Sequence, residues 1–125
     1  MKNRPLALVI DDSDDTREMY AVMLRLEGFA VEEARDGREA LHKAREPLPD
    51  IIITDLAMPI MDGWETIRRL RADERTRRIP IIVCSGQTFP THTHDCGADA
   101  LIPKPCALDM LLLEVRGLLR RDAAA

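Results

Sequence analysis

The chain has 125 residues, 46% of them apolar and 32% charged, which fits one soluble domain with its own hydrophobic core. Eighteen basic against 22 acidic residues give a formal net charge of −4, which argues against binding nucleic acid through bulk positive charge. The three cysteines have no paired spacing, and no apolar stretch approaches the roughly 20 residues that span a bilayer, so we expect no disulfide framework, zinc ribbon or membrane insertion.

Five short apolar runs alternate with longer amphipathic segments. The runs are Leu6–Ile10, residues 29–34, Ile51–Thr54, residues 79–84 and residues 98–102. Three of them are nearly uninterrupted aliphatic residues, as expected of strands that are covered on both faces in a parallel sheet. The second run contains Glu32 and Glu33, which predicts an edge strand with one exposed side.

Apolar stripes in the intervening segments predict helices. The stripe of the first helix is formed by Met19, Tyr20, Met23, Leu24 and Leu26, and that of the last helix by Leu108, Leu111, Leu112, Val115, Leu118 and Leu119. We expect residues 121–125 to fray at the end of the chain.

Capping signals predict where some helices begin and end. Asp36 with Glu39, and Asp62 with Glu65, have the spacing of capping boxes, which predicts the starts of the second and third helices. Gly28 and Gly97 are expected at helix C-termini.

The fivefold strand–helix alternation predicts an α/β fold of the (βα)5 type. Right-handed crossovers then give a doubly wound, five-stranded parallel sheet with helices on both faces. In such sheets the functional crevice lies at the carboxyl ends of the strands, so the residues that follow each apolar run are the candidates for a site.

Charged and hydroxyl side chains follow four of the five runs. Asp11 and Asp12 follow the first run, Asp55 the third, Ser85 the fourth and Lys104 the fifth. Three carboxylates at one rim repel each other unless a cation intervenes, and oxygen ligands are those that Mg²⁺ accepts. The pattern therefore predicts a site for a divalent ion and an incoming phosphoryl group.

These residues resemble the receiver domain of two-component response regulators over essentially the whole chain. Residues 55–63 read D-L-A-M-P-I-M-D-G, close to the family pattern D-x-x-M-P-x-M-D-G, and residues 97–99 (G-A-D) lead to Lys104 and Pro105. The resemblance implies the flavodoxin-like strand order 2-1-3-4-5 and a cis peptide bond before Pro105.

The resemblance also implies a ligand set for Mg²⁺ as cofactor. Asp12, Asp55 and the backbone carbonyl of Ala57 would bind the ion directly, and Asp11 would act mainly through a bound water.

A role in phosphoryl transfer is implied for three matching positions. Asp55 would be the nucleophile that takes a phosphoryl group from a phosphohistidine on a sensor histidine kinase or a histidine phosphotransfer protein. Lys104 would neutralise charge on the transferring oxygens, and Ser85 would hydrogen-bond a phosphoryl oxygen once Asp55 is modified.

The sequence departs from the family pattern in two places. Receivers usually carry a Tyr or Phe in the fifth strand whose rotamer follows the hydroxyl residue, and here Leu101 takes that switch position beside Ser85. Residues 85–104 are also about one helical turn shorter than is common, and they contain F-P and T-H-T-H. We therefore predict a short, displaced or irregular fourth helix.

We interpret the chain as a single receiver domain over residues 1–125 with no output domain, a stand-alone cytoplasmic regulator that switches a protein-binding surface. It would act on a downstream protein target without binding nucleic acid directly, as a monomer or a weak phosphorylation-dependent dimer, and would turn over no separate substrate. Alternatives are a receiver excised from a larger regulator or hybrid histidine kinase, and a phosphorylation-independent docking module. A phosphatase of the haloacid-dehalogenase type is disfavoured because Ala57 stands where its second Asp is expected.

Two further patterns have less favoured functional interpretations. His92, His94, Asp95 and Cys96 suggest zinc, but ligands at i and i+2 do not share a helix face. Six arginines within residues 68–78 suggest a nucleic-acid patch, although acidic residues interrupt them and a solvated helix end is favoured.

Overall fold

Five parallel strands form one sheet in the order β2-β1-β3-β4-β5, which confirms the predicted topology and the edge position of the Glu-containing strand. The computed structural model describes residues 4–58, 60–86 and 97–124. The strands are β1 (Leu6–Ile10), β2 (Ala30–Ala34), β3 (Ile51–Thr54), β4 (Ile81–Ser85) and β5 (Ala100–Pro103). The last two begin two residues later than their apolar runs, as is usual for element boundaries.

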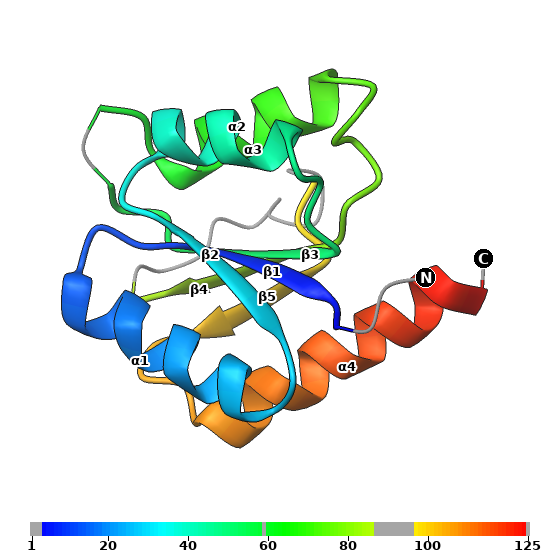
Figure 1. The fold of residues 1–125 in the computed structure, drawn as a ribbon. Helices are drawn as coiled ribbons and strands as arrows, with labels where there is room; N and C mark the ends of the chain where they lie inside the picture. The colour runs from blue at the N-terminus through cyan, green and yellow to red at the C-terminus, as the bar shows by residue number, and fades with distance from the viewer. Residues whose placement is uncertain (1–3, 59, 87–96, 125) are drawn as a thin grey trace.

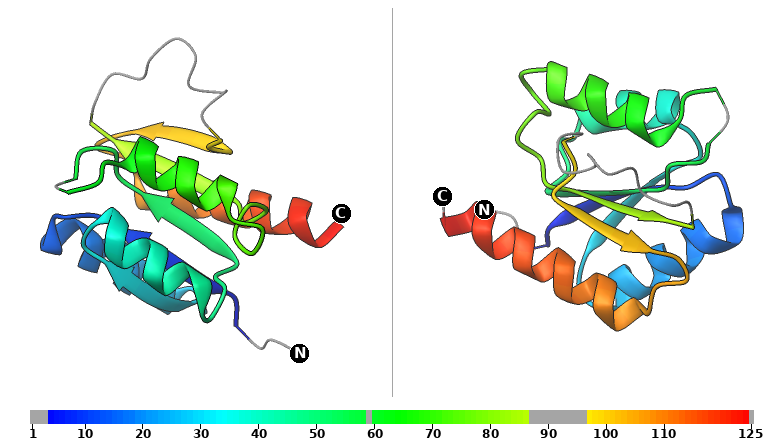
Figure 2. Two further views of the ribbon diagram at one scale, coloured as in Figure 1. Left: turned by 90° about the horizontal axis from the view of Figure 1, so that it is seen from above. Right: turned by 180° about the vertical axis from the view of Figure 1, so that it is seen from behind.

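Helices cover both faces of this sheet. They are α1 (Asp14–Leu26), α2 (Gly37–Arg45), α3 (Gly63–Ala72) and α4 (Leu108–Ala124). The views in Figures 1 and 2 show α2 and α3 on one face and α1 and α4 on the other. The region of the predicted fourth helix lies, apart from Gly86, outside the described residues, so α4 corresponds to the last predicted helix.

The two layers have separate cores because successive side chains of a strand point to opposite faces. Towards α1 and α4 point Ala7, Val9, Ile51, Ile53, Ile82 and Cys84. Towards α2 and α3 point Leu8, Ile10, Ile52, Ile81 and Val83. All of these are buried, so the near-continuous apolar runs fill both layers, as predicted for a parallel sheet.

The predicted helix starts are confirmed by their caps. The Asp36 side chain accepts a hydrogen bond from the backbone N–H of Glu39 at 2.9 Å, and Asp62 accepts one from Glu65 N–H at 2.9 Å. At the end of α1, Gly28 has a φ of 96°, a left-handed conformation that glycine adopts without steric cost.

The predicted apolar stripe of α1 is only partly correct. Tyr20 and Leu24 are buried as expected, together with Ala21, but Met19 and Leu26 are exposed. Tyr20, Ala21 and Leu24 occupy the arc of the helix that faces the sheet. Because each residue turns the helix by about 100°, Met19 and Leu26 lie on the opposite, exposed side.

Helix α4 packs as predicted but extends further. Leu111, Val115 and Leu118 are buried, whereas fraying from residue 121 is wrong, since the helix continues to Ala124. Alanine is the best helix former, and a basic last turn suits the helix dipole.

One of the six clustered arginines does not belong to a solvated helix end. Arg71 donates hydrogen bonds to the backbone carbonyls of Gly97, Arg77 and Ile79 at 2.6–2.9 Å, and it pairs with Asp99 at 2.9 Å. It thereby ties α3 to the segment that enters β5, at the end of the sheet opposite the predicted site.

Two leucines of α4 offer a matched test of this packing. Leu111 is fully buried, whereas Leu113 is 66% exposed. We expect Leu111→Ala to lower the free energy of unfolding by about 2–5 kcal/mol, because it leaves a cavity between α4 and the sheet. Leu113→Ala should change it by less than about 0.5 kcal/mol. Urea denaturation measures both, and equal losses would contradict the packing.

Candidate functional site

Strand register brings the predicted site residues to one edge of the sheet. Ile10 of β1 is in register with Thr54 of β3, so Asp11 and Asp55, the next residues, leave the sheet side by side. Ser85 is in register with Pro103, and the backbone N–H of Lys104 donates to the Ser85 carbonyl at 2.8 Å. Residues far apart in sequence therefore converge as expected.

Three carboxylates meet at this edge. Asp11, Asp12 and Asp55 each offer an oxygen, and these oxygens all lie within 4.8 Å of one another. Asp11 is 2% exposed and Asp12 is exposed, so the cluster is open to solvent on one side. A set of carboxylate oxygens with room for water is the donor set that Mg²⁺ accepts, and the residues present therefore fit this ion.

The ammonium of Lys104 joins two of the three acids. Its Nζ donates to Asp11 Oδ2 at 2.8 Å and to Asp55 Oδ2 at 3.4 Å. Burial alone would lower the pKa of Lys104, but the hydrogen bond and charge of Asp11, with those of Asp55, outweigh it and raise the pKa above its ordinary value. Lys104 is therefore a permanent cation at neutral pH.

The backbone fixes the direction of the Asp55 carboxylate. Its Oδ1 accepts a hydrogen bond from the Leu56 N–H at 2.7 Å, which turns Oδ2 towards Lys104. The Thr54 hydroxyl donates to the Asp55 carbonyl at 2.9 Å. Thr54 was not predicted to take part in the site. The signal that could have indicated it is a single hydroxyl residue at the end of a run of isoleucines.

Gly63 packs directly against the Asp55 backbone. A Cβ at this position would lie 2.2 Å from the Asp55 carbonyl oxygen and 2.8 Å from Leu56 Cα. The Gly63 N–H also donates to the Leu56 carbonyl at 2.9 Å. The first turn of α3 thus abuts the chain beside Asp55, which accounts physically for the D-G at the end of the 55–63 motif.

The remaining predicted residues surround this centre. Ser85 is buried and is the last residue of β4 instead of following it, and Ala57 is exposed. Leu101 is half-buried and, like the half-buried Trp64, packs against the core beneath α2 and α3. The Lys104–Pro105 peptide bond is cis, as the resemblance implied. The cluster of His92, His94, Asp95 and Cys96 lies outside the described residues.

The doubly wound fold, with an acidic cluster and a lysine at the carboxyl ends of its strands, is typical of a signalling domain, and a family comparison agrees. The family model for the response regulator receiver domain matches residues 7–116. The chain belongs to the family of response regulator receiver domains.

Curated relatives are longer than this chain. Response regulator MprA of Mycolicibacterium vanbaalenii is 40% identical over 117 residues, 91% of this chain and 50% of that protein. The DNA-binding dual master transcriptional regulator RpaA of Synechocystis is 37% identical over 120 residues, 94% of this chain and 50% of that protein. The chain therefore spans about half the length of the curated relatives it matches.

Solved structures of similar length share the fold. The chemotaxis response regulator CheY4 of Vibrio cholerae superposes with a TM-score of 0.84 at 33% identity, over 91% of this chain and 98% of that one. The signal receiver domain of a signal transduction histidine kinase from Syntrophus aciditrophicus gives a TM-score of 0.86 at 34% identity. The match covers 93% of this chain and 90% of that one.

Family membership fixes the general role of the chain. Receiver domains are signalling domains of two-component systems that interact with histidine kinases or phosphotransfer proteins, and they generally bind Mg²⁺ at an acidic pocket, which the Asp11–Asp12–Asp55 cluster provides here. Within the described ranges, no helix has the length and apolar character needed to cross a membrane.

Two glycine substitutions test how closely α3 abuts Asp55. Gly63→Ala should lower the free energy of unfolding by about 1–3 kcal/mol, because the new Cβ forces the backbone at Asp55 to shift. Gly117→Ala is the matched control: nothing lies within 4 Å of its added Cβ, and the helix interior should gain about 0.5–1 kcal/mol. Denaturant unfolding measures both, and a neutral Gly63→Ala would contradict the contact.

Proposed function

We propose that this receiver accepts a phosphoryl group on Asp55 and thereby switches a protein-binding surface. The observation that carries the proposal is the position of Lys104, which contacts the carboxylates of Asp11 and Asp55 at 2.8 and 3.4 Å beside the acidic cluster. A cation at this place is suited to meet the charge of a phosphoryl group that arrives at Asp55.

The transfer is a substitution at phosphorus. A carboxylate oxygen of Asp55 forms the new P–O bond, while the P–N bond to the donor histidine breaks and its electron pair returns to the ring nitrogen. An acyl phosphate results. When bound, Mg²⁺ supplies neutralisation of charge on the phosphoryl oxygens. The Leu56 N–H holds Oδ1, so the chain itself orients the nucleophile.

The hydrogen bonds of Asp11 favour an indirect role for it at the metal. Its Oδ1 accepts from the Ser13 N–H at 2.9 Å and its Oδ2 accepts from Lys104. Lys104 lies closer to Asp11 than to Asp55, at 2.8 Å compared with 3.4 Å, so Asp11 is the acid that the ammonium already neutralises more, whereas Asp12 is exposed. We assign Asp12, Asp55 and the Ala57 carbonyl as direct Mg²⁺ ligands and Asp11 as a ligand through water.

Phosphorylation would act as a switch because it replaces the single negative charge of the Asp55 carboxylate by a phosphoryl group with a charge of about −1.5 to −2 beside Lys104. The ammonium then has a stronger partner than Asp11, and the Ser85 hydroxyl has a phosphoryl oxygen to bind. Leu101, half-buried one strand away, would move with Ser85 without offering the phenolic hydroxyl of a tyrosine. The altered surface would lie along β4 and β5.

We propose a sensor histidine kinase or a histidine phosphotransfer protein as the donor and a downstream protein as the target, with the receiver a monomer or a weak phosphorylation-dependent dimer. The relatives include a DNA-binding regulator and the receiver of a histidine kinase, so domains similar to this one occur in proteins of different kinds.

Intact mass spectrometry tests the phosphoacceptor. After incubation with acetyl phosphate and Mg²⁺, the protein should gain about 80 Da, because a carboxylate oxygen of Asp55 displaces acetate at phosphorus. The Asp55→Asn variant should gain nothing. Asp15→Asn, which changes an exposed acid of α1, is the matched control and should be modified as the wild type is.

A gain that persists in Asp55→Asn would place the phosphoryl group elsewhere and contradict the proposal. An unmodified wild type would instead favour the phosphorylation-independent docking module.

A further inference from the structure

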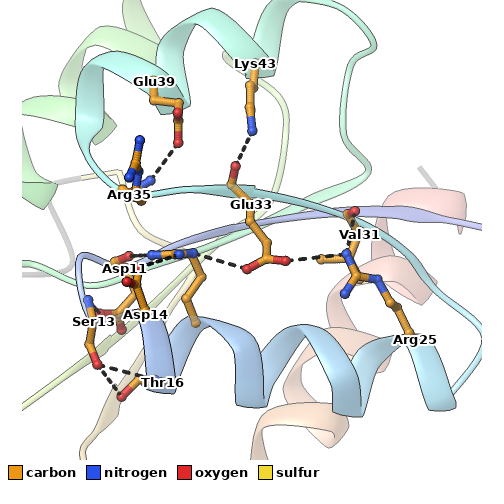
Figure 3. Close-up of polar contacts among 11 residues, drawn as sticks. Asp11, Ser13, Asp14, Thr16, Arg25, Val31, Glu33, Arg35, Glu39 and Lys43 are labelled. Carbon is orange, nitrogen blue, oxygen red and sulfur yellow. Dashed lines mark hydrogen bonds and ion pairs between the residues drawn. The ribbon is translucent and has the colours of Figure 1, made fainter.

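Arg17 lies beside the acidic cluster and is the most enclosed cation of α1. Its side chain is 12% exposed, compared with 48% for Arg25 on the same helix. The guanidinium donates in three directions, to the Asp11 backbone carbonyl at 2.8 Å, to Glu33 Oε1 at 3.1 Å and to Asp14 Oδ1 at 2.6 Å. Figure 3 shows these three acceptors around one point between α1 and β2.

The contact with the Asp11 carbonyl bears directly on the acidic cluster. That oxygen belongs to the peptide group that joins Asp11 to Asp12, and a peptide group is rigid and planar. Holding the oxygen therefore restrains the orientation of the peptide plane that contains the Cα atoms of both residues. The other groups of Asp11 are also held, by the carbonyl of Ala34, by the Ser13 N–H and by Lys104.

On its other side, the guanidinium contacts β2, the edge strand of the sheet. Glu33 is in register with Val9 of β1, and its backbone carbonyl accepts a hydrogen bond from Lys43 of α2. Arg25 also reaches Glu33, at 3.5 Å, but its other hydrogen bond goes to the Val31 carbonyl, at 3.4 Å, and not to the loop of the acids. Arg17 thus links the edge strand β2, which is held by β1 and by Lys43 of α2, to the loop that carries the acids.

We propose that Arg17 is a positioning residue for the Mg²⁺ site: by holding the Asp11 carbonyl it sets the orientation of the Asp11–Asp12 peptide and with it the affinity for the ion. This inference rests on the proposed function, because it assumes that the acidic cluster binds Mg²⁺. Residues that orient metal ligands from outside typically change metal affinity about 10- to 100-fold when removed.

Charge and geometry predict opposite results for the loss of Arg17. If its positive charge were all that mattered, removing it would strengthen the binding of a cation nearby, and the freed carboxylates of Asp14 and Glu33 would add to the attraction. If Arg17 orients the peptide, its removal weakens binding. The sign of the change in Mg²⁺ affinity therefore distinguishes an effect of charge from an effect of geometry.

Isothermal titration of Mg²⁺ into four proteins tests the inference. We compare the wild type, Arg17→Ala, Arg17→Lys and the matched control Arg25→Ala, which loses the same side chain from the same helix and the same partner, Glu33. Arg17→Lys keeps the charge but replaces a planar fork by one ammonium, so any weakening in it comes from geometry. Thermal unfolding with EDTA and with Mg²⁺ is recorded in parallel.

We expect the dissociation constant for Mg²⁺ to rise about tenfold or more in Arg17→Ala, to rise less in Arg17→Lys and to stay unchanged in Arg25→Ala. The rise in melting temperature that a fixed Mg²⁺ concentration produces should shrink accordingly, which a purely structural role would not cause. If Arg17→Ala does not fold, the change in the dissociation constant of Arg17→Lys tests the inference instead.

Three results would overturn the inference. Unchanged or tighter Mg²⁺ binding in the folded Arg17 variants, or an equal loss in Arg25→Ala, would remove the positioning role while leaving the proposed function intact. A wild type that binds no Mg²⁺ would overturn the proposed function as well.

Discussion

The contact between the Lys104 ammonium and the carboxylates of Asp11 and Asp55 is the interaction on which the site depends. Three acids within 4.8 Å of one another repel each other, and partly buried charges feel that repulsion strongly. Lys104 offsets one of the three negative charges at 2.8 and 3.4 Å and leaves the other two for an added cation. The same lysine is then available to a phosphoryl group, so one side chain serves both the resting and the modified site.

The doubly wound sheet makes this contact possible. Its strands are parallel and end at one edge, so residues 49 and 93 positions away from Lys104 meet it there. Two buried layers on opposite faces of the sheet hold the strands, and the close approach of Gly63 to the Asp55 carbonyl holds the loop that follows β3. The packing of the sheet and its helices thus offsets the repulsion between the carboxylates. Arg17 connects this packed part of the molecule to the Asp11–Asp12 loop.

Much of this was predictable because it depends on local pattern. Apolar runs predicted the strands, the spacing of Asp36 with Glu39 predicted a helix start, and the residues after each run predicted the site. The contacts of Arg17 with Asp11 and Glu33, and that of Arg71 with Gly97, were not predictable. These partners are 6, 16 and 26 positions distant, and no periodicity specifies them. The buried face of α1 was predicted only in part, because the small residue Ala21 completes the arc against the sheet with Tyr20 and Leu24, whereas Met19 lies on the other side of the helix.

The most direct measurement of the central claim is a crystal structure of the chain with Mg²⁺ and beryllofluoride, which mimics a phosphoryl group on a carboxylate. We predict the ion about 2.0–2.1 Å from oxygens of Asp12 and Asp55, beryllium on Asp55, and the Lys104 ammonium in contact with fluoride. A structure in which beryllofluoride and Mg²⁺ bind away from this edge, or in which Lys104 points to solvent with both bound, would contradict the account.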